Sequence, residues 1–410
     1  MHCTISATLS AIWLLVAIDA NASAADWPHW RGPHYDGLSR ETDWQSHNLK
    51  PLWRQGVQTG FSSVGISAGR VYTMGNSGSK TNTDPNNQAD TVFCLEADSG
   101  RILWRHTYPC PLLPKQYEGG PGATPAVVDG RVYTLSKVGD VFCLDALTGD
   151  VVWSRNVTRD FGAEAPGWGF AGSPVVWNEC LILSAGESGI ALNKNTGDLI
   201  WQNGTAPAGY STVVPFKIGG TNVLALLNAT ALVALTPDTG EICWRIPWPT
   251  KDGFNMADPI IAGASDKSIF VSSGYRQGAA RIAADRESAE IVWKSRAMHN
   301  HLATCVLIDG FIYGMDYYTL ACVDYKTGET KWTHRGLGQG SLTASIDGRL
   351  IILGEKGQLV IARANPEAWD PIDELQPLTG RCWTVPVLAD GRIYVRNAVG
   401  ELVCLDARKH

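Results

Sequence analysis

The stretch V-F-C-L-D-A-L-T-G-D-V-V-W, residues 141–153, decides the fold of this chain. Its first four residues form a continuous apolar run, which suits a strand that is covered on both faces. Residues 145–149 supply a tight turn, because Gly149 can take a positive φ at no steric cost. The Val-Val-Trp tail then predicts a second strand, so the whole stretch predicts a hairpin.

Copies of this hairpin recur along the chain and align on the turn glycine and the tryptophan that follows it. Successive tryptophans are 39 to 49 residues apart. A period in the forties belongs to a propeller blade or to a helical repeat, and the strand-like content favours the blade. The tryptophans are Trp104, Trp153, Trp201, Trp244, Trp293 and Trp332.

A second recurring hairpin precedes each copy. Its clearest examples, residues 124–133, 304–313 and 386–394, join two apolar runs through Asp-Gly, a strong hairpin signal. The two hairpins together make four antiparallel strands, which is one blade. Because this second hairpin occurs eight times, the sequence predicts an all-β, eight-bladed β-propeller of four-stranded antiparallel blades. These hairpins span residues 66–72, 126–133, 175–182, 213–225, 260–270, 306–313, 344–351 and 387–394.

The last blade lacks a fourth strand of its own. The chain reaches His410 without a further Gly-x-x-x-Trp strand, whereas Pro51-Leu52-Trp53 near the N-terminus matches one. We therefore expect residues 26–56 to close the ring by adding a strand to the last blade, which removes two exposed sheet edges.

Four long connections interrupt the repeats. Residues 76–90 are predicted to be a solvated insertion between the second and third strands of the first blade, and residues 108–122, 158–172 and 363–381 to be connections into innermost strands. Long loops on a rigid scaffold are where function is expected.

Charge and the N-terminal composition restrict the class of protein. The formal net charge is -6 and no run of Lys or Arg exceeds two residues, so a partner nucleic acid or an anionic membrane is not expected. Residues 11–18 are apolar and residues 20–25 are mostly small, which predicts a signal peptide over residues 1–25. The alternative for this run is a buried N-terminal strand. We expect a monomer without a membrane span, with residues 26–410 forming one domain in the periplasm or outside the cell.

The repeated tryptophans and cysteines are expected to be structural. An indole at one fixed place on each outer strand suits docking between blades. Four cysteines occupy one repeat position that the other blades fill with Ala191, Ala234, Ala283 and Ile361, which indicates a tight apolar slot and free thiols. The four cysteines are Cys94, Cys143, Cys322 and Cys404; disulfide pairing among Cys110, Cys180, Cys243, Cys305 and Cys382 stays open.

The candidate site residues come from propeller geometry. The connection from the outermost strand of one blade to the innermost strand of the next opens at one mouth of the central channel, so polar and aromatic residues there converge. Such a ring would bind a polar, flat ligand, and the alternative is a hydrated funnel. No metal ligand set is predicted, because the pair His299 and His301 has no carboxylate nearby in sequence. The candidates are Glu118, Trp168, Tyr210, Asn255, Asp258, His299, His301 and Arg381.

The blade unit A-x-D-x-x-T-G-x-x-x-W resembles the repeat of the pyrroloquinoline quinone (PQQ) propellers, and residues 94–104, 143–153 and 322–332 match it best. Residues 30–37 (W-R-G-P-H-Y-D-G) and 168–174 (W-G-F-A-G-S-P) look like stretches of the secreted PQQ-like repeat proteins of planctomycete-type bacteria. The resemblance implies either a quinoprotein dehydrogenase or a non-enzymatic protein similar to the lipoprotein of the outer-membrane barrel-assembly machinery. The chain departs from the dehydrogenases in lacking adjacent cysteines and C-x-x-C-H, and from the lipoprotein in lacking a lipobox cysteine.

Two functions follow as hypotheses. The first is a non-catalytic scaffold, without a cofactor, that binds a partner protein or a polar small ligand at one channel mouth. The alternative is a PQQ-dependent dehydrogenase that oxidises an alcohol or aldose. In that hypothesis PQQ and calcium would occupy the mouth, Asp258 or Glu118 would accept the substrate proton, and Arg381 would hold the quinone oxygens.

Overall fold

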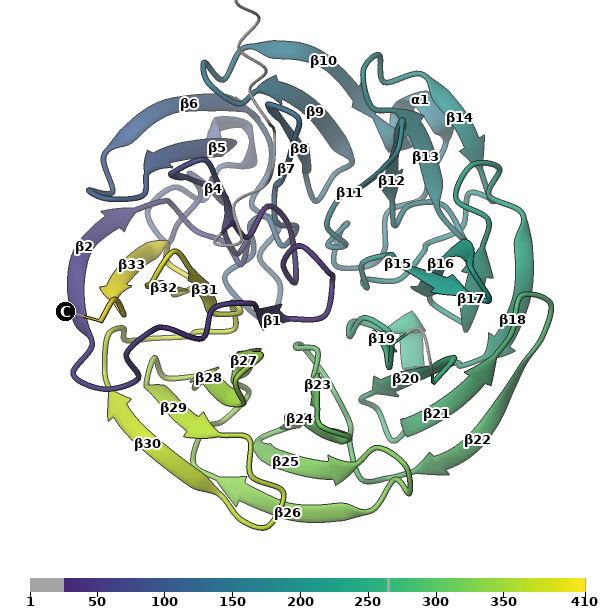
Figure 1. The fold of residues 1–410 in the computed structure, drawn as a ribbon. Coiled ribbons are helices and arrows are strands. Elements are labelled where there is room, and N and C mark those ends of the chain that lie inside the picture. The colour runs from purple at the N-terminus through teal and green to yellow at the C-terminus, as the bar shows by residue number, and fades with distance from the viewer. Residues whose placement is uncertain (1–25, 264–265, 410) are drawn as a thin grey trace, which may run out of the picture.

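The computed structural model describes residues 26–263 and 266–409; the predicted signal peptide, residues 1–25, lies outside them. Eight sheets surround a central axis (Figure 1); seven have four strands and one has a short fifth strand added in parallel, and the four strands of each blade are antiparallel. The predicted eight-bladed all-β propeller is confirmed. From the innermost strand outwards, the blades contain β3 (Gly65–Ser67), β4 (Arg70–Asn76), β5 (Ala89–Glu96) and β6 (Ile102–Pro109); β7 (Ala126–Val128), β8 (Arg131–Leu135), β9 (Asp140–Asp145) and β10 (Val151–Asn156); β11 (Val175–Trp177), β12 (Cys180–Leu183), β13 (Ile190–Asn193) and β14 (Leu199–Gln202); β15 (Val214–Ile218), β16 (Thr221–Leu227), β17 (Ala231–Leu235) and β18 (Ile242–Pro247); β19 (Ile260–Ile261), β20 (Ser268–Ser273), β21 (Gly278–Ala284) and β22 (Ala289–Ser295); β23 (Val306–Ile308), β24 (Phe311–Asp316), β25 (Thr319–Asp324) and β26 (Thr330–Arg335); β27 (Ser341–Ser345), β28 (Arg349–Leu353), β29 (Leu359–Arg363) and β30 (Asp370–Leu375); and β31 (Val387–Ala389), β32 (Arg392–Arg396), β33 (Glu401–Asp406) and β2 (Lys50–Gly56).

Helices play a small part. Besides the strand β1 (Leu38–Ser39), the described residues form α1 (Val157–Phe161) and the 3-10 turns η1 (Pro85–Asn87) and η2 (Lys251–Gly253). None of the helices in residues 26–263 and 266–409 has the length and apolar character needed to cross a membrane.

In seven of the eight blades a tryptophan on the outer strand docks the blade onto the next, as expected. Trp104 on β6 donates a hydrogen bond from Nε1 to the carbonyl oxygen of Ala146 over 3.1 Å, and its ring lies against Gly149 in the following blade. A Cβ atom at Gly149 would lie 2.6 Å from Trp104 Cε3, and the residue has a φ of 78°. The turn glycine is therefore required both by its backbone conformation and by the indole above it.

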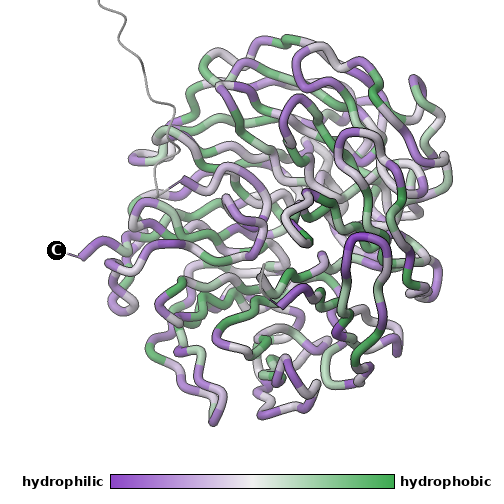
Figure 2. Tube along the Cα trace, turned by 45° about the vertical axis from the view of Figure 1, so that its right-hand side comes forward, coloured by the Kyte–Doolittle hydropathy of each residue, from purple (hydrophilic) through white to green (hydrophobic). Residues whose placement is uncertain are grey.

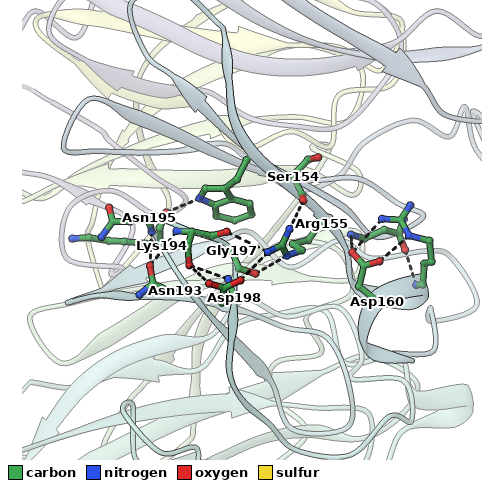
Figure 3. A network of polar contacts seen from close by, with 12 residues as sticks. Ser154, Arg155, Asp160, Asn193, Lys194, Asn195, Gly197 and Asp198 are labelled. Carbon is green, nitrogen blue, oxygen red and sulfur yellow. Dashed lines mark hydrogen bonds and ion pairs between the residues drawn. The ribbon is translucent and has the colours of Figure 1, made fainter.

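Polar contacts accompany this docking. In Figure 3, Arg155 from β10 reaches the turn of the next blade, where Nε donates to the carbonyl oxygen of Gly197 over 2.9 Å and Nη2 approaches Asp198 Oδ1 at 2.9 Å. Trp153, two residues before Arg155 on the same strand, donates from Nε1 to the carbonyl oxygen of Lys194. The outer strand thus holds the neighbouring turn through both an indole and a guanidinium.

The apolar core is divided among the blade interfaces. Eight clusters of buried side chains lie between neighbouring blades, and the hydropathy-coloured tube in Figure 2 shows apolar residues along the strands. Cys143 is fully buried, with Tyr133 and Trp153 as its partners in register on the flanking strands. The cysteines of the described residues are all free, so the expected free thiols in the repeat slot are confirmed.

The N-terminal strand closes the ring, as predicted. β2 pairs antiparallel with β33, and Trp53 on β2 donates from Nε1 to the carbonyl oxygen of Ala97 in the first blade over 2.9 Å. The strand pairing of β2 with β33 and the indole contact of Trp53 therefore repeat those of the other tryptophan-bearing blades.

One sequence-based expectation is wrong. Residues 363–381 were expected to be a connecting loop, but residues 370–375 form β30, the outer strand of the seventh blade. The strand carries Asp373 opposite Ile361, where other blades carry tryptophan, so the repeat signature is missing. Trp44, from the N-terminal segment, fills the interface of the seventh and eighth blades instead, fully buried beneath the guanidinium of Arg349 at 3.8 Å.

Candidate functional site

The central channel has two different ends. The connections between blades gather at one end, which we call the collar end, and the turns between the first two strands of each blade lie at the other, the hairpin end. The two ends are occupied by different parts of the chain.

Residues 26–41 occupy the channel from the hairpin end. The N–H of Trp27 donates to the carbonyl oxygen of Ile66 over 3.0 Å, and the carbonyl oxygen of Pro28 accepts from the N–H of Val127 over 2.7 Å. Further along, β1 pairs in parallel with β27, and Figure 1 shows this segment crossing the centre of the ring. The segment therefore bonds to innermost strands of the first, second and seventh blades.

A ring of side-chain oxygens lines the channel between this segment and the collar end. Each backbone N–H of one member donates to the side-chain oxygen of the next, at 2.6 to 3.1 Å. The members each stand two residues ahead of an innermost strand. In the order of these hydrogen bonds they are Ser63, Thr124, Ser173, Thr212, Asp258 and Thr304.

Asp258 is the only carboxylate among these six members, and both of its oxygens have partners. Oδ1 accepts from the N–H of Thr212 over 2.6 Å, while Oδ2 accepts from Trp30 Nε1 over 2.6 Å and from Thr304 Oγ1 over 3.3 Å. Arg31 Nε lies 4.0 Å from Oδ2. Burial raises the pKa of Asp258, and Arg31 and the hydrogen bonds act in the opposite direction. The second oxygen thus anchors the N-terminal segment.

One side chain from each of the eight connections forms a continuous set at the collar end, which we call the aromatic collar. Six of its members are partly exposed, and Tyr210 and Gln339 are buried. The aromatic collar consists of Phe61, Tyr117, Trp168, Tyr210, Phe254, His301, Gln339 and Trp383.

The rings of the aromatic collar pack on one another from blade to blade. Phe61 stacks on Trp383 at 5.5 Å between centroids and meets Tyr117 edge-on at 5.4 Å. Tyr117 stacks on Trp168 at 5.1 Å, and Trp168 lies 6.5 Å from Phe254. Aromatic pairs at such distances add about 0.5 to 1.5 kcal/mol each beyond their buried area.

The collar members from Phe254 round to Trp383 are joined by one aromatic stack and a series of polar contacts. Tyr275, from the turn between β20 and β21, stacks on Phe254 at 5.1 Å, and its hydroxyl lies 3.0 Å from His301 Nε2. His301 Nδ1 lies 3.0 Å from Gln339 Nε2. Glu355 then joins Gln339 to Trp383, because its carboxylate accepts from the Gln339 N–H over 3.1 Å and from Trp383 Nε1 over 3.2 Å.

The candidate residues from the sequence fall into three places. Trp168, Tyr210 and His301 are members of the aromatic collar. Arg381 and Glu118 lie beside it as an ion pair of 2.6 Å, with the Arg381 guanidinium 4.4 Å from the Trp383 ring.

The other three candidates lie outside the aromatic collar. His299 bonds to Asp316 through Nδ1 at 2.8 Å. Asn255 is buried and donates to the carbonyl oxygens of Asn228 and Trp248, and Asp258 lies in the channel as described.

Sequence reasoning missed four aromatic members. Phe61, Tyr117, Phe254 and Trp383 each precede an innermost strand by four to nine residues, as Trp168 does by seven. Their place ahead of each innermost strand was the available signal, and it applies to every blade. Only the packing in three dimensions distinguishes these rings from ordinary core aromatics.

The two carboxylates assigned as bases in the dehydrogenase hypothesis both have partners within the chain. Asp258, the proposed base, is buried and has partners on both oxygens, and Glu118 is bound to Arg381. Within the described residues, no three His, Cys, Asp or Glu side chains gather as ligands of one metal ion. Both candidate bases are therefore already engaged by other groups of the chain.

Comparison with known proteins gives two kinds of relative. The outer membrane protein assembly factor BamB of Yersinia pestis is 22% identical over 295 residues, which cover 68% of this chain and 72% of that protein. The quinoprotein ethanol dehydrogenase of Pseudomonas aeruginosa is 27% identical over 194 residues, which cover 43% of this chain and only 29% of the dehydrogenase.

Solved structures of the same two kinds share the fold. The crystal structure of BamB from Moraxella catarrhalis superimposes with a TM-score of 0.61 at 14% identity, covering 88% of this chain and 98% of that one. Quinohemoprotein alcohol dehydrogenase from Comamonas testosteroni gives 0.65 at 15% identity, covering 94% and 81%. The family model described as outer membrane protein assembly factor BamB matches residues 88–334, more than half of the sequence. The chain therefore belongs to this family of PQQ-like β-propeller repeat proteins.

Proposed function

We propose that this protein is a non-catalytic scaffold, exported to the periplasm, that binds a partner protein at its aromatic collar. The observation that carries the proposal is the collar itself, in which connections from all eight blades place interlocked side chains at one end of the ring. Six of these side chains are partly exposed. Aromatic residues and arginine are the side chains that most often dominate binding energy at protein interfaces.

Rigidity supports the same proposal. Each aromatic member is held by a neighbour from another blade, so little conformational freedom is lost when a partner binds. Residues 26–41 bond to innermost strands of three blades, so the collar is proposed as a binding surface and not as the entrance to an open channel. The matching family model is described as an assembly factor, which is in keeping with a role in binding proteins.

The test is site-directed photo-crosslinking in cells that express and export the protein. One variant carries the crosslinker at position 168 in the collar, and the other carries it at position 147 on the hairpin end. Leu147 is 67% exposed and serves as the matched control. We expect a partner to be crosslinked from position 168 only. Binding of the purified partner should then weaken at least about tenfold in Trp168→Ala, which is about 1.4 kcal/mol, and stay unchanged in Leu147→Ala.

Three outcomes contradict the proposal. Equal crosslinking from both positions would place the partner elsewhere. A collar-specific small molecule without a protein partner would favour the polar-ligand alternative. Saturable binding of PQQ with calcium, accompanied by reduction of an artificial electron acceptor in the presence of an alcohol or aldose, would replace the scaffold with the dehydrogenase.

A further inference from the structure

Two lysines and two tyrosines meet where the second, third and fourth blades contribute to the aromatic collar. Lys137 Nζ donates to Tyr117 Oη over 2.7 Å and lies 4.7 Å from the centre of that ring. The N–H of Trp168 donates to Tyr210 Oη over 3.2 Å. Lys115 bonds through Nζ to the carbonyl oxygen of Gly167 and lies 5.3 Å from the Trp168 ring.

This cluster has hydrogen-bond donors in excess. The hydroxyl oxygens of Tyr117 and Tyr210 act as acceptors, so the hydroxyl hydrogen of each is free to be donated. In residues 26–263 and 266–409 neither hydroxyl has an acceptor within hydrogen-bond distance. Burial raises the pKa of Tyr117 and that of Tyr210 to about 12, so both remain donors at neutral pH.

The cluster also has positive charge in excess. Lys137 is only 4% exposed, and neither Lys137 nor Lys115 pairs with a carboxylate within the described part of the chain. Burial lowers the pKa of Lys137 to about 8; Asp90 opposes this shift, and the nearby charge of Lys115 adds to it. A buried cation without a counter-ion is costly, and an anion beside it recovers part of that cost.

Free donors, unpaired cations and partly exposed aromatic rings together define an anion site. We propose that Lys115, Tyr117 and Tyr210 bind a carboxylate of the partner polypeptide, with Lys137 behind Tyr117 strengthening its hydroxyl as a donor. The two oxygens of a carboxylate accept several such hydrogen bonds at once, and charge-assisted bonds are the strong ones. This inference rests on the proposed function and names the chemistry of the group that docks there.

The test uses a random peptide library selected on the purified protein, followed by calorimetry of a selected peptide. We expect selected peptides to carry Asp or Glu, and the counterpart with Asn or Gln at those positions to bind at least about tenfold more weakly. Lys115→Gln and Tyr117→Phe should each weaken binding about fivefold, with a smaller salt dependence for Lys115→Gln. Lys251→Gln, at an exposed lysine of the same end, is the matched control and should bind as wild type.

The outcomes separate this inference from the proposed function. If binding of the selected peptides requires Trp168 but is unchanged when their Asp or Glu is replaced by Asn or Gln, the carboxylate site is wrong and the scaffold proposal stands. If no selected peptide depends on Trp168, both are wrong. If acetate, benzoate or inorganic phosphate alone binds as tightly as the peptide and loses affinity in the same variants, the site belongs to a small anion and the partner assignment is overturned.

Discussion

The indole nitrogen of Trp30 donates a hydrogen bond to Asp258 Oδ2 over 2.6 Å, across 228 positions of sequence. Asp258 stands where five other blades place a hydroxyl, and its first oxygen serves the ring of side-chain oxygens as those hydroxyls do. Its second oxygen holds Trp30, and Arg31 lies 4.0 Å away. The carboxylate at this position is thus explained by the N-terminal segment that lies in the channel, without a catalytic role.

Asp258→Asn tests this explanation. The substitution keeps an oxygen and the volume but removes the charge that faces Arg31, whose side chain is 4% exposed. Since breaking a buried pair leaves an uncompensated charge, we expect the free energy of unfolding to fall by about 3 kcal/mol in urea denaturation. Asp252→Asn, in the same connection but exposed, should change it by less than about 0.5 kcal/mol. Equal effects of the two substitutions would contradict the anchoring role.

Much of the fold could be predicted from the sequence, because the signature is local and repeated. Gly149 and Trp153 recur together, and each pair of hairpins folds as one blade. The outer strand of the seventh blade could not be predicted, because Asp373 stands where the signature has tryptophan. Its missing indole is replaced by Trp44, which is far away in sequence and reaches the interface only in the folded protein.

The candidate site was less predictable from sequence. Its members all lie in the connections ahead of innermost strands, but at different distances from those strands. Trp168, Tyr210 and His301 were found by their position ahead of innermost strands. Phe61 and Trp383 occupy equivalent positions, but a lone aromatic residue there has no sequence feature that separates it from a core residue. The role of Asp258 depends on a contact between distant parts of the chain, which local patterns do not contain.

The turn glycines offer a matched pair within one blade. Gly149 has a φ of 78° with the Trp104 ring against it, whereas Gly130 has a φ of 70° and nothing within 4 Å of an added Cβ. Gly130→Ala should cost about 1 to 2 kcal/mol, the strain of the left-handed conformation alone. Gly149→Ala should cost at least about 2 kcal/mol more, because the indole must move and its packing is lost. If the two substitutions lower the free energy of unfolding equally, the contact with the Trp104 indole is not a reason why position 149 must be glycine.

The cysteines predict a simple labelling pattern. Of the nine described cysteines, eight are buried and Cys243 is partly exposed. Burial raises the pKa of Cys143 to about 11 and that of Cys404 to about 12, which keeps both in the unreactive thiol form. We expect a thiol reagent to modify one residue, Cys243, in the native protein and the rest after unfolding. A Cys243→Ser variant that still reacts at the same rate would contradict this assignment.

Reduction provides an independent check on the same cysteines. Because the described thiols are free, a reducing agent should leave the midpoint of thermal unfolding unchanged. A fall in that midpoint would indicate a disulfide that contributes to stability.

His29 predicts how stability depends on pH. It lies buried in the channel segment, stacked on Tyr35 at 4.1 Å between centroids, and burial lowers its pKa from 6.5 to about 4. Between these two values the unfolded chain binds more protons than the folded one, so stability falls as the pH drops from about 6.5 to about 4. The loss attributable to His29 is about 3 kcal/mol.

His29→Phe separates this contribution from those of other groups. Phenylalanine keeps a ring on Tyr35 but does not titrate, so its unfolding free energy should fall by about 3 kcal/mol less than that of wild type over the same pH range. His47→Gln, at an exposed histidine, should keep the wild-type slope. If His29→Phe and wild type lose stability in parallel, the pKa of His29 is not lowered in the folded protein, and His29 is not buried in the channel segment as described.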